Sequence, residues 1–328
     1  MDFTLTDEQV LLQETARRLL AAESPTSLVR AHADDRSVAG PNGLWRHLRE
    51  WTDLGSGGLV DLCLFLEETG AAVAPGPFLA TTLLFAPIAA AAGSSAATGT
   101  VALAGASGQW TPNDEPVRTF VLDVDLVDRV AIVTAASGGP TVAIADAADL
   151  AHREVKTLDP SRRIFEVTVP DAVSAVAINP EVVSRLLERA WVGLAAEMLG
   201  TSRWLFDRTL EYAKQREQFG RPIGSFQAIQ HKLANMALVR ERAWAAVYYA
   251  AMCIDAGDAD ASRAAHVAKA SAGEAVRLCA KDGIQIHGGV GFTWEHDLHL
   301  FLRRAFASEH LLGTTDWHYD RLADLIFA

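Results

Sequence analysis

The sequence predicts an α+β fold with a helical region first, a small β region in the middle and a long helical region last. Up to about residue 99, apolar side chains recur at helical spacing. From about residue 100 to 172, short β-branched segments alternate with Gly, Pro and Asp, as strands and turns do. From residue 173 onward the helical spacing returns over long segments. We therefore expect three domains, 1–99, 100–172 and 173–328.

The first region begins with a helix start signal. Thr6 is a favourable N-cap residue, and two acidic residues follow it in what would be the first turn. Further helices are expected over 45–51 and 59–69, the second with Gly70 as its stop. Residues 69–113 carry no charged side chain, but they are mostly small residues interrupted by prolines, so they predict buried helix and not a membrane span.

The middle region contains short segments that read as strands. Each is rich in β-branched or aromatic residues and is bounded by turn formers. The expected strands cover 101–104, 119–122, 130–133, 141–144 and 163–169.

The last region predicts an antiparallel four-helix bundle. Leu187, Trp191, Leu194 and Met198 fall at i, i+4, i+7 and i+11, so they share one face of a helix that we expect to reach about Gln218. Further helices are expected from about 226 past 249, over 262–287 and over 299–310, with a tail helix after Gly313. Long helices with short connections are typical of a bundle.

The apolar faces of the first two bundle helices are broad. They include Trp191, Met198, Trp204 and Met236, more than one internal stripe requires. We therefore expect the bundle to be an assembly surface.

Composition excludes several classes of function. Against 41 acidic residues the chain has 29 Lys and Arg, a net charge of −12, which argues against a nucleic-acid surface. Cys63, Cys253 and Cys279 are odd in number and widely spaced, as reduced thiols of a cytoplasmic protein are. The first residues, MDFTLTDEQ, have no basic segment and predict no signal peptide. His296 and His299 do not fit a metal-ligand pattern, so we expect polar surface there and no metal site.

Two segments of the last region could carry chemistry, and the first is Tyr212–Ala237. Its residues predict a helix that ends near Phe219, with Gly220 as its left-handed cap and Ser225 as the cap of the next helix. Arg216 then projects from the last turn, where a cation complements the helix dipole. From these residues alone, a plain helix hairpin with a solvated arginine is the favoured interpretation, and a ligand-binding arginine stays open.

The second segment is Gly283–Ala305. Three glycines, Gly288, Gly289 and Gly291, allow the backbone to approach a large flat ligand, or simply end a helix. The spacing is not GxGxxG and no strand precedes it, so a Rossmann site is excluded.

Together these segments resemble the C-terminal bundle of the flavin-dependent acyl-CoA dehydrogenases. The N-terminal MDFTLTDEQ, the stretch Leu59–Leu79 and the TLDPSRR segment also resemble this family, so the likeness covers nearly the whole chain. The resemblance implies that an RxxFG hairpin, the FQ that opens the next helix and a QxxGG helix end grip the ADP half of an FAD, which sits mainly in a neighbouring subunit. The matching residues are Arg216, Gln218, Phe219, Phe226, Gln227, Gln285, Gly288 and Gly289.

The chain departs from the family at the catalytic base. The family places a glutamate at one of two positions, which here are Leu312, before Gly313-Thr314, and Ala190. Neither can abstract a proton. Glu188, Glu309 and Asp316 lie nearby on different helical faces, and we expect them to be surface charges. The family's flavin-holding loops in the β domain also have no counterpart in residues 100–170, which are short.

The resemblance and the departures together predict a non-catalytic subunit of a heteromeric FAD-dependent acyl-CoA dehydrogenase. We expect a homologous full-length partner, in a heterodimer or an α2β2 heterotetramer, to hold the base and most of a bulky acyl-CoA, such as a steroid side-chain thioester. An electron-transferring flavoprotein is the acceptor that the family implies. Two alternatives stay open: a self-sufficient homomeric enzyme with Glu309 or Asp316 as a displaced base, and a flavin-free scaffold.

Overall fold

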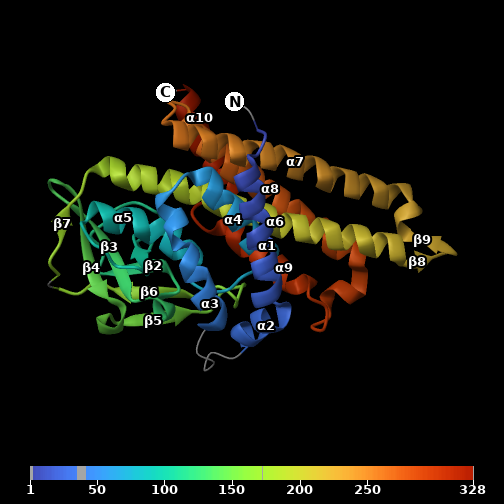
Figure 1. Ribbon diagram of the computed structural model, residues 1–328, viewed down its shortest axis with the longest axis horizontal. Helices are drawn as coiled ribbons and strands as arrows, with labels where there is room; N and C mark the ends of the chain where they lie inside the picture. The colour runs from blue at the N-terminus through green and yellow to red at the C-terminus, as the bar shows by residue number, and fades with distance from the viewer. Residues whose placement is uncertain (1–2, 35–41, 172, 328) are drawn as a thin grey trace.

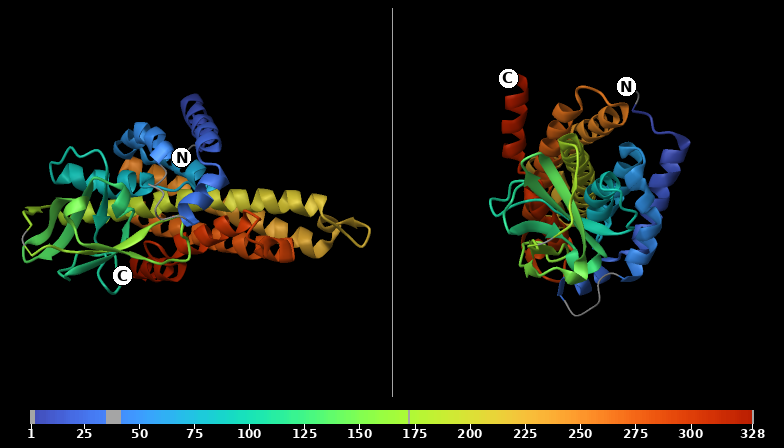
Figure 2. Two further views of the ribbon diagram at one scale, coloured as in Figure 1. Left: turned by 90° about the horizontal axis from the view of Figure 1, so that it is seen from below. Right: turned by 90° about the vertical axis from the view of Figure 1, so that its left-hand side faces the viewer.

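The computed structural model describes residues 3–34, 42–171 and 173–327. The molecule is elongated along a bundle of long helices, with the β region at one end and a small hairpin at the other (Figures 1 and 2). The N-terminal helices lie across the middle of the bundle (Figure 1).

The first region is helical, as predicted, and Thr6 caps its first helix. The Thr6 hydroxyl accepts a hydrogen bond from the Gln9 N–H (3.2 Å), and the Gln9 side chain accepts one from the Thr6 N–H (3.1 Å). This reciprocal pair is a capping box. The helical segments are α1(Asp7–Glu23), α2(Thr26–Asp34), α3(Asn42–Leu48), the 3-10 segment η1(Arg49–Ser56), α4(Leu59–Ala71), the π-helix η2(Ala80–Phe85) and α5(Ala86–Ala91).

Gly70 is not the stop that the sequence predicted, because α4 continues to Ala71. Gly70 instead lies where α4 meets α6(Pro180–Gln215): a Cβ there would lie 1.8 Å from the Glu197 carbonyl oxygen. Gly200 on α6 lies equally close to the backbone of α4, since a Cβ added there would lie 1.7 Å from the Glu67 carbonyl oxygen. Two glycines therefore set the distance between the first region and the bundle.

The middle region forms two sheets, one with strand order β1-β3-β4-β7 and one with β2-β6-β5. β1 pairs with β3 in parallel, and the other pairs within these sheets are antiparallel. Val121, Val130, Ile132, Phe165 and Val167 form part of a buried apolar cluster between strands of the two sheets. The strands are β1(Gly99–Ala102), β2(Val117–Leu122), β3(Arg129–Ala136), β4(Gly139–Asp146), β5(His152–Val155), β6(Ile164–Thr168) and β7(Val176–Ala177).

Five strands fall where the sequence predicted them, and two were missed. β5 is His-Arg-Glu-Val and largely exposed, while β7 has only two residues, so neither has an apolar pattern to detect.

The last region is helical, as predicted. Its helices after α6 are α7(Gln227–Ala256), α8(Ala261–His287), α9(Leu298–His310) and α10(Thr315–Phe327). α6, α7 and α8 form the long axis of the molecule (Figure 1).

The predicted end of the first bundle helix was wrong by several residues. α6 ends at Gln215, and the residues after it form a hairpin of β8(Glu217–Gln218) and β9(Arg221–Pro222). Phe219 and Gly220 make the turn with φ of +55° and +76°, and positive φ at both central residues is the pattern of tight two-residue hairpins. Ser225 does not cap the next helix either, because its hydroxyl donates to the Pro222 carbonyl and Phe226 occupies the N-cap.

The broad apolar faces expected to be an assembly surface are covered within this chain. Met198 and Met236 are fully buried and Trp191 is 7% exposed. Trp204 stacks on Phe301 of α9. These side chains pack inside the chain, because α4, α8, α9 and α10 cover faces of α6 and α7 that the sequence pattern had left open.

The three cysteines are free and buried. No helix within the described ranges is long and apolar enough to cross a membrane.

Candidate functional site

The first predicted cofactor segment forms the exposed hairpin at the end of the bundle (Figure 1). Arg216 follows the last residue of α6, and Gln218 and Phe219 lie in the hairpin, where Phe219 is 92% exposed. The ring of Phe219 meets that of Phe226 edge to face at 6.1 Å, and the Arg221 guanidinium lies 4.2 Å over Phe226. The hairpin thus presents an aromatic side chain to the outside instead of folding it inward.

The second predicted segment lies beside the base of this hairpin. Gln285 is exposed near the end of α8, and Gly288 follows with φ of +59°. Tyr212, in the last turn of α6, stacks on His287 with ring centroids 4.3 Å apart. The structure therefore brings the two segments to one end of the bundle.

These residues fit the ADP half of an FAD. Arg216 and Gln285 are exposed, and their side chains form no hydrogen bond or ion pair with any residue that the structure describes. A Cβ added at Gly288 or Gly289 would meet nothing within 4 Å, so the backbone there is open to a close approach. An unpaired guanidinium suits a diphosphate, which it can bind through two parallel hydrogen bonds. Gln227, at the start of α7, is exposed on the same hairpin connection.

The two positions at which the family carries its base are apolar and closed. Ala190 is fully buried in α6. Leu312 is 1% exposed and sits in a turn with φ of +60°. No carboxylate stands at either place.

The turn around Leu312 is nevertheless held by buried polar groups. The Lys269 ammonium donates to the carbonyls of Glu309 (2.9 Å) and Gly313 (2.7 Å). Burial lowers the pKa of Lys269 to about 7, and the nearby negative charge of Glu309 offsets only part of this loss of water.

Two neutral histidines complete this cluster. His318 Nε2 lies 3.2 Å from the Leu312 carbonyl, which can only accept, so this nitrogen carries the proton. His318 Nδ1 therefore accepts from His266 Nδ1, 2.8 Å away. Burial lowers the pKa of His266 to about 4 and that of His318 to about 2, with nearby positive charges adding to the effect.

The expected surface carboxylates behave differently from one another. Asp316 is exposed, as predicted, and Glu188 is half-buried. Glu309 is not a surface charge: it is 3% exposed and accepts a hydrogen bond from the Thr315 N–H (2.9 Å). Burial alone would raise the pKa of Glu309, but the hydrogen bonds from Thr315 lower it. Glu309 is thus engaged at the first turn of α10.

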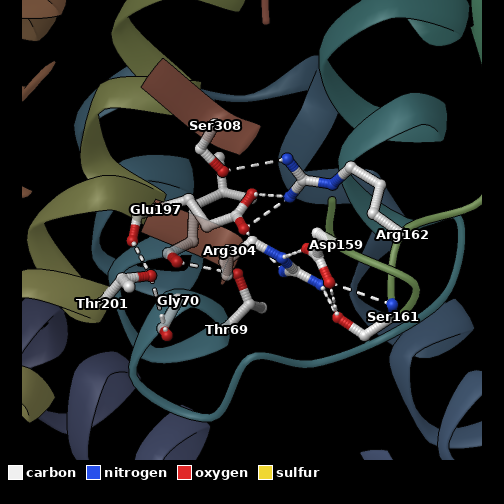
Figure 3. Close-up of polar contacts among 10 residues, drawn as sticks. Thr69, Gly70, Asp159, Ser161, Arg162, Glu197, Thr201, Arg304 and Ser308 are labelled. Carbon is white, nitrogen blue, oxygen red and sulfur yellow. Dashed lines mark hydrogen bonds and ion pairs between the residues drawn. The ribbon is translucent and has the colours of Figure 1, made fainter. Parts of the chain in front are cut away.

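A buried ion network closes the junction between the β region and the bundle (Figure 3). The Arg162 Nη2 donates to both oxygens of Glu197 on α6, at 2.5 and 2.6 Å. Arg304 on α9 donates to Glu197 (2.8 Å) and pairs with Asp159. Ser308 also accepts from Arg162, at 3.1 Å. Two guanidiniums and two carboxylates balance in charge.

The space that remains at this junction is very small. A cavity of about 20 Å³ is lined by Arg162, Glu197 and Arg304, by Asp123 and by residues after α4. It has room for about one water molecule. Burial raises the pKa of Asp123 to about 7. Neither a flavin ring nor an acyl chain fits a volume of this size.

Sequence reasoning missed this network as a site. Asp159 and Arg162 lie in a segment noted only for its family resemblance, and Arg304 lies in the second candidate segment without being singled out there. Glu197 was passed over in an apolar stretch of α6. A charged residue between Ala196 and Met198 is the signal that could have found it, because charges are almost never fully buried unless paired.

The histidines after the glycine-rich turn are not simply polar surface. His299 is 8% exposed and stacks on Trp294 at 4.5 Å, whereas His296 is half-buried. The described residues include no group of three His, Cys, Asp or Glu side chains that could hold a metal ion.

Comparisons with known proteins agree with this architecture. Residues 181–327 match the family described as "Acyl-CoA dehydrogenase, C-terminal domain". The chain is 34% identical over 321 residues to the acyl-CoA dehydrogenase IpdE2 of Mycobacterium tuberculosis, covering 93% of each chain.

Two solved structures share its fold over nearly all of both chains. One, the ChsE4-ChsE5 complex from Mycobacterium tuberculosis, has a TM-score of 0.90 and 24% identity, with 99% of each chain covered. The other, titled "Tcur3481-Tcur3483 steroid ACAD G363A variant", has a TM-score of 0.85 and 27% identity, with 98% of each chain covered. The chain belongs to the acyl-CoA dehydrogenase family of FAD-binding oxidoreductases.

Proposed function

We propose that this chain is the non-catalytic subunit of a heteromeric acyl-CoA dehydrogenase. It contributes the ADP side of an FAD site whose flavin ring, base and acyl-CoA pocket belong to a homologous partner. The complex removes hydrogens from Cα and Cβ of a bulky acyl-CoA, and an electron-transferring flavoprotein receives the electrons.

The main support for this proposal is the lack of space at the junction between the β region and the bundle. Dehydrogenation of a thioester needs a carboxylate at Cα, while hydride leaves Cβ for the flavin. Glu197 lies seven residues, or two turns, after Ala190 on α6, so the ion network stands on the same face of the helix as one of the family's base positions. The cavity at this junction, about 20 Å³, leaves no volume there in which a flavin and a thioester could meet.

The exposed end of the bundle supports the second half of the proposal. A chain that bound no flavin would have no use for Arg216 and Gln285, both unpaired within the described residues, beside open glycines. This speaks against a flavin-free scaffold.

The relatives support the heteromeric assembly and the substrate class. One solved relative is described as a complex of two named chains, and another as a steroid enzyme with two named chains. We extend both features to this protein, with a steroid side-chain thioester as the proposed bulky acyl group.

A homomeric enzyme with a displaced base is less consistent with the contacts. Glu309 is buried and accepts from Thr315, so swinging it toward a substrate would leave the start of α10 without its acceptor. Asp316 is exposed on α10 and does not line the buried cavity at the junction.

Reconstitution tests the proposal. The chain is expressed alone, together with a homologous full-length acyl-CoA dehydrogenase, and alone as the Leu312→Glu variant. We expect bound FAD and steroid-CoA dehydrogenation only in the co-purified complex. Turnover by the unaltered chain or by Leu312→Glu without a partner would refute the proposal.

A further inference from the structure

The segment between α8 and α9, residues 288–297, lacks a core of its own. Among its described residues only Gly291 is buried, while Phe292 is 73% and Trp294 50% exposed. A segment with few buried contacts opens locally unless something else holds it. It also contains Gly288 and Gly289, which the proposed function places against the cofactor.

Arg30 of α2, more than 250 residues away in sequence, holds this segment through its backbone carbonyls and through the Asp297 side chain. Its guanidinium donates twice to Asp297 Oδ1, at 3.1 and 2.7 Å. It also donates to the carbonyls of Trp294 (2.6 Å) and Glu295 (3.4 Å). Thr26, one turn earlier on α2, donates to the other Asp297 oxygen at 2.9 Å.

These contacts pair the charges of Arg30 and Asp297 and also hold the backbone of the segment. A guanidinium that binds two successive carbonyls fixes the path of the backbone, and a point charge such as Lys could not copy its fork. Trp294 is held from a second direction, because its ring stacks on His299 and lies under the Arg303 guanidinium at 4.8 Å.

The other end of the segment is fixed by stacked rings. Tyr212 stacks on His287, and His287 meets His296 edge to face at 5.2 Å. His287 Nδ1 also lies 2.8 Å from the Gly283 carbonyl. The segment that contains the glycine-rich turn is therefore held at two places. The bundle holds it through His287, and α2 holds it through Arg30.

We propose that Arg30 is a positioning residue for the FAD: by holding residues 294–297 it keeps the turn at Gly288 and Gly289 in the conformation that receives the ADP half. The inference rests on the proposed function. It assigns to the N-terminal helices a part in cofactor binding, although Arg30 itself does not touch the cofactor.

The test compares complexes of the partner with four forms of this chain: unaltered, Arg30→Gln, Arg17→Gln and Arg216→Ala. Arg17 is the matched control, since it makes a two-point ion pair with Glu68 on α4, outside this segment. Apo complexes are titrated with FAD by flavin fluorescence, and kcat is measured at saturating FAD. If the competent turn falls to about a tenth of the population, the FAD dissociation constant rises about tenfold.

We expect this rise for Arg30→Gln with kcat at saturating FAD unchanged, and no rise for Arg17→Gln. A merely structural role would lower kcat or the folded fraction and leave the FAD affinity of the remaining complex unchanged. Asp297→Asn, which removes the charge but keeps the shape, is the second variant if Arg30→Gln does not assemble, and it should weaken FAD binding in the same direction.

Two results would contradict the inference. One contradicts only the positioning role of Arg30, and the other contradicts the proposed function as well. If Arg216→Ala weakens FAD binding but Arg30→Gln and Asp297→Asn do not, only the positioning role fails. If none of the three weakens it, the proposed function fails as well.

Discussion

At Glu197 one carboxylate receives hydrogen bonds from two buried guanidiniums, those of Arg162 and Arg304. Such a network adds little net stability compared with an apolar core, but removing one member costs about 3–5 kcal/mol, because the others stay buried and unpaired. Replacing any single member of the network is therefore expected to destabilise the folded protein. The network keeps the β region docked on the bundle and the junction closed.

The His266–His318 pair makes stability depend on pH. In the unfolded chain each histidine binds a proton below about pH 6.5, whereas the folded-state pKa values are about 4 and about 2. Between pH 6.5 and 4 the unfolded state binds more protons, so the free energy of unfolding falls as the pH is lowered. Each histidine adds up to about 1.4 kcal/mol per pH unit to this slope.

Urea unfolding at several pH values measures the effect. The His266→Gln, His318→Gln double variant should lose stability less steeply between pH 6.5 and 4 than the unaltered protein. His231→Gln, at an exposed position of α7, is the control variant. Equal slopes in all three proteins would show that the pair does not stay neutral when folded.

Where single residues lie could be predicted only if a local motif contained them. Arg216 and Gln285 belong to two short sequence motifs, RxxFG and QxxGG. The structure places both residues at one exposed end of the bundle. Glu197 has no such pattern, because its partners are 35 and 107 residues away in sequence. The burial of Glu309 was missed for the same reason: its acceptor role depends on the turn to α10 and not on helical periodicity.

At the scale of elements, the contact between α4 and α6 is set by Gly70 and Gly200. The close approach of each to the opposite backbone leaves no room for a side chain. Periodicity predicted both helices, but it cannot show which glycine ends a helix and which faces another helix, so Gly70 was misread. The hairpin after α6 was missed for a related reason, since Phe-Gly fits both a helix cap and a tight turn.

Gly200→Ala should be strongly destabilising. Its Cβ would lie 1.7 Å from the Glu67 carbonyl oxygen and 2.7 Å from the Ala71 nitrogen, so the helices must separate, at a cost of about 3 kcal/mol or more. Gly43→Ala on α3 is the control, because nothing lies within 4 Å of its added Cβ. Thermal unfolding of both variants checks this. A Gly200→Ala protein as stable as the control would contradict the close helix contact.

At the scale of the whole molecule, the order helix, sheet, helix was predictable because each region has its own period of apolar residues. Surfaces were less predictable. The apolar residues assigned to an assembly face turned out to be internal, because the packing of α9 and α10 cannot be read from the period of α6 and α7. The exposed end of the bundle, with its hairpin and glycine-rich turn, is instead the surface where we place a partner's cofactor (Figure 2).

The FAD affinity of the complex with Arg216→Ala, Gln285→Ala in this chain and an unaltered partner tests the central claim most directly. Arg185→Ala, an exposed arginine near the other end of α6, is the control. Losing a charge-assisted contact to the diphosphate should weaken FAD binding about ten- to a hundredfold, while the thermal stability of this chain barely changes. The control complex should bind FAD normally. Full FAD affinity and full activity in the double variant would contradict the account, because the bundle end would then play no part in the partner's flavin site.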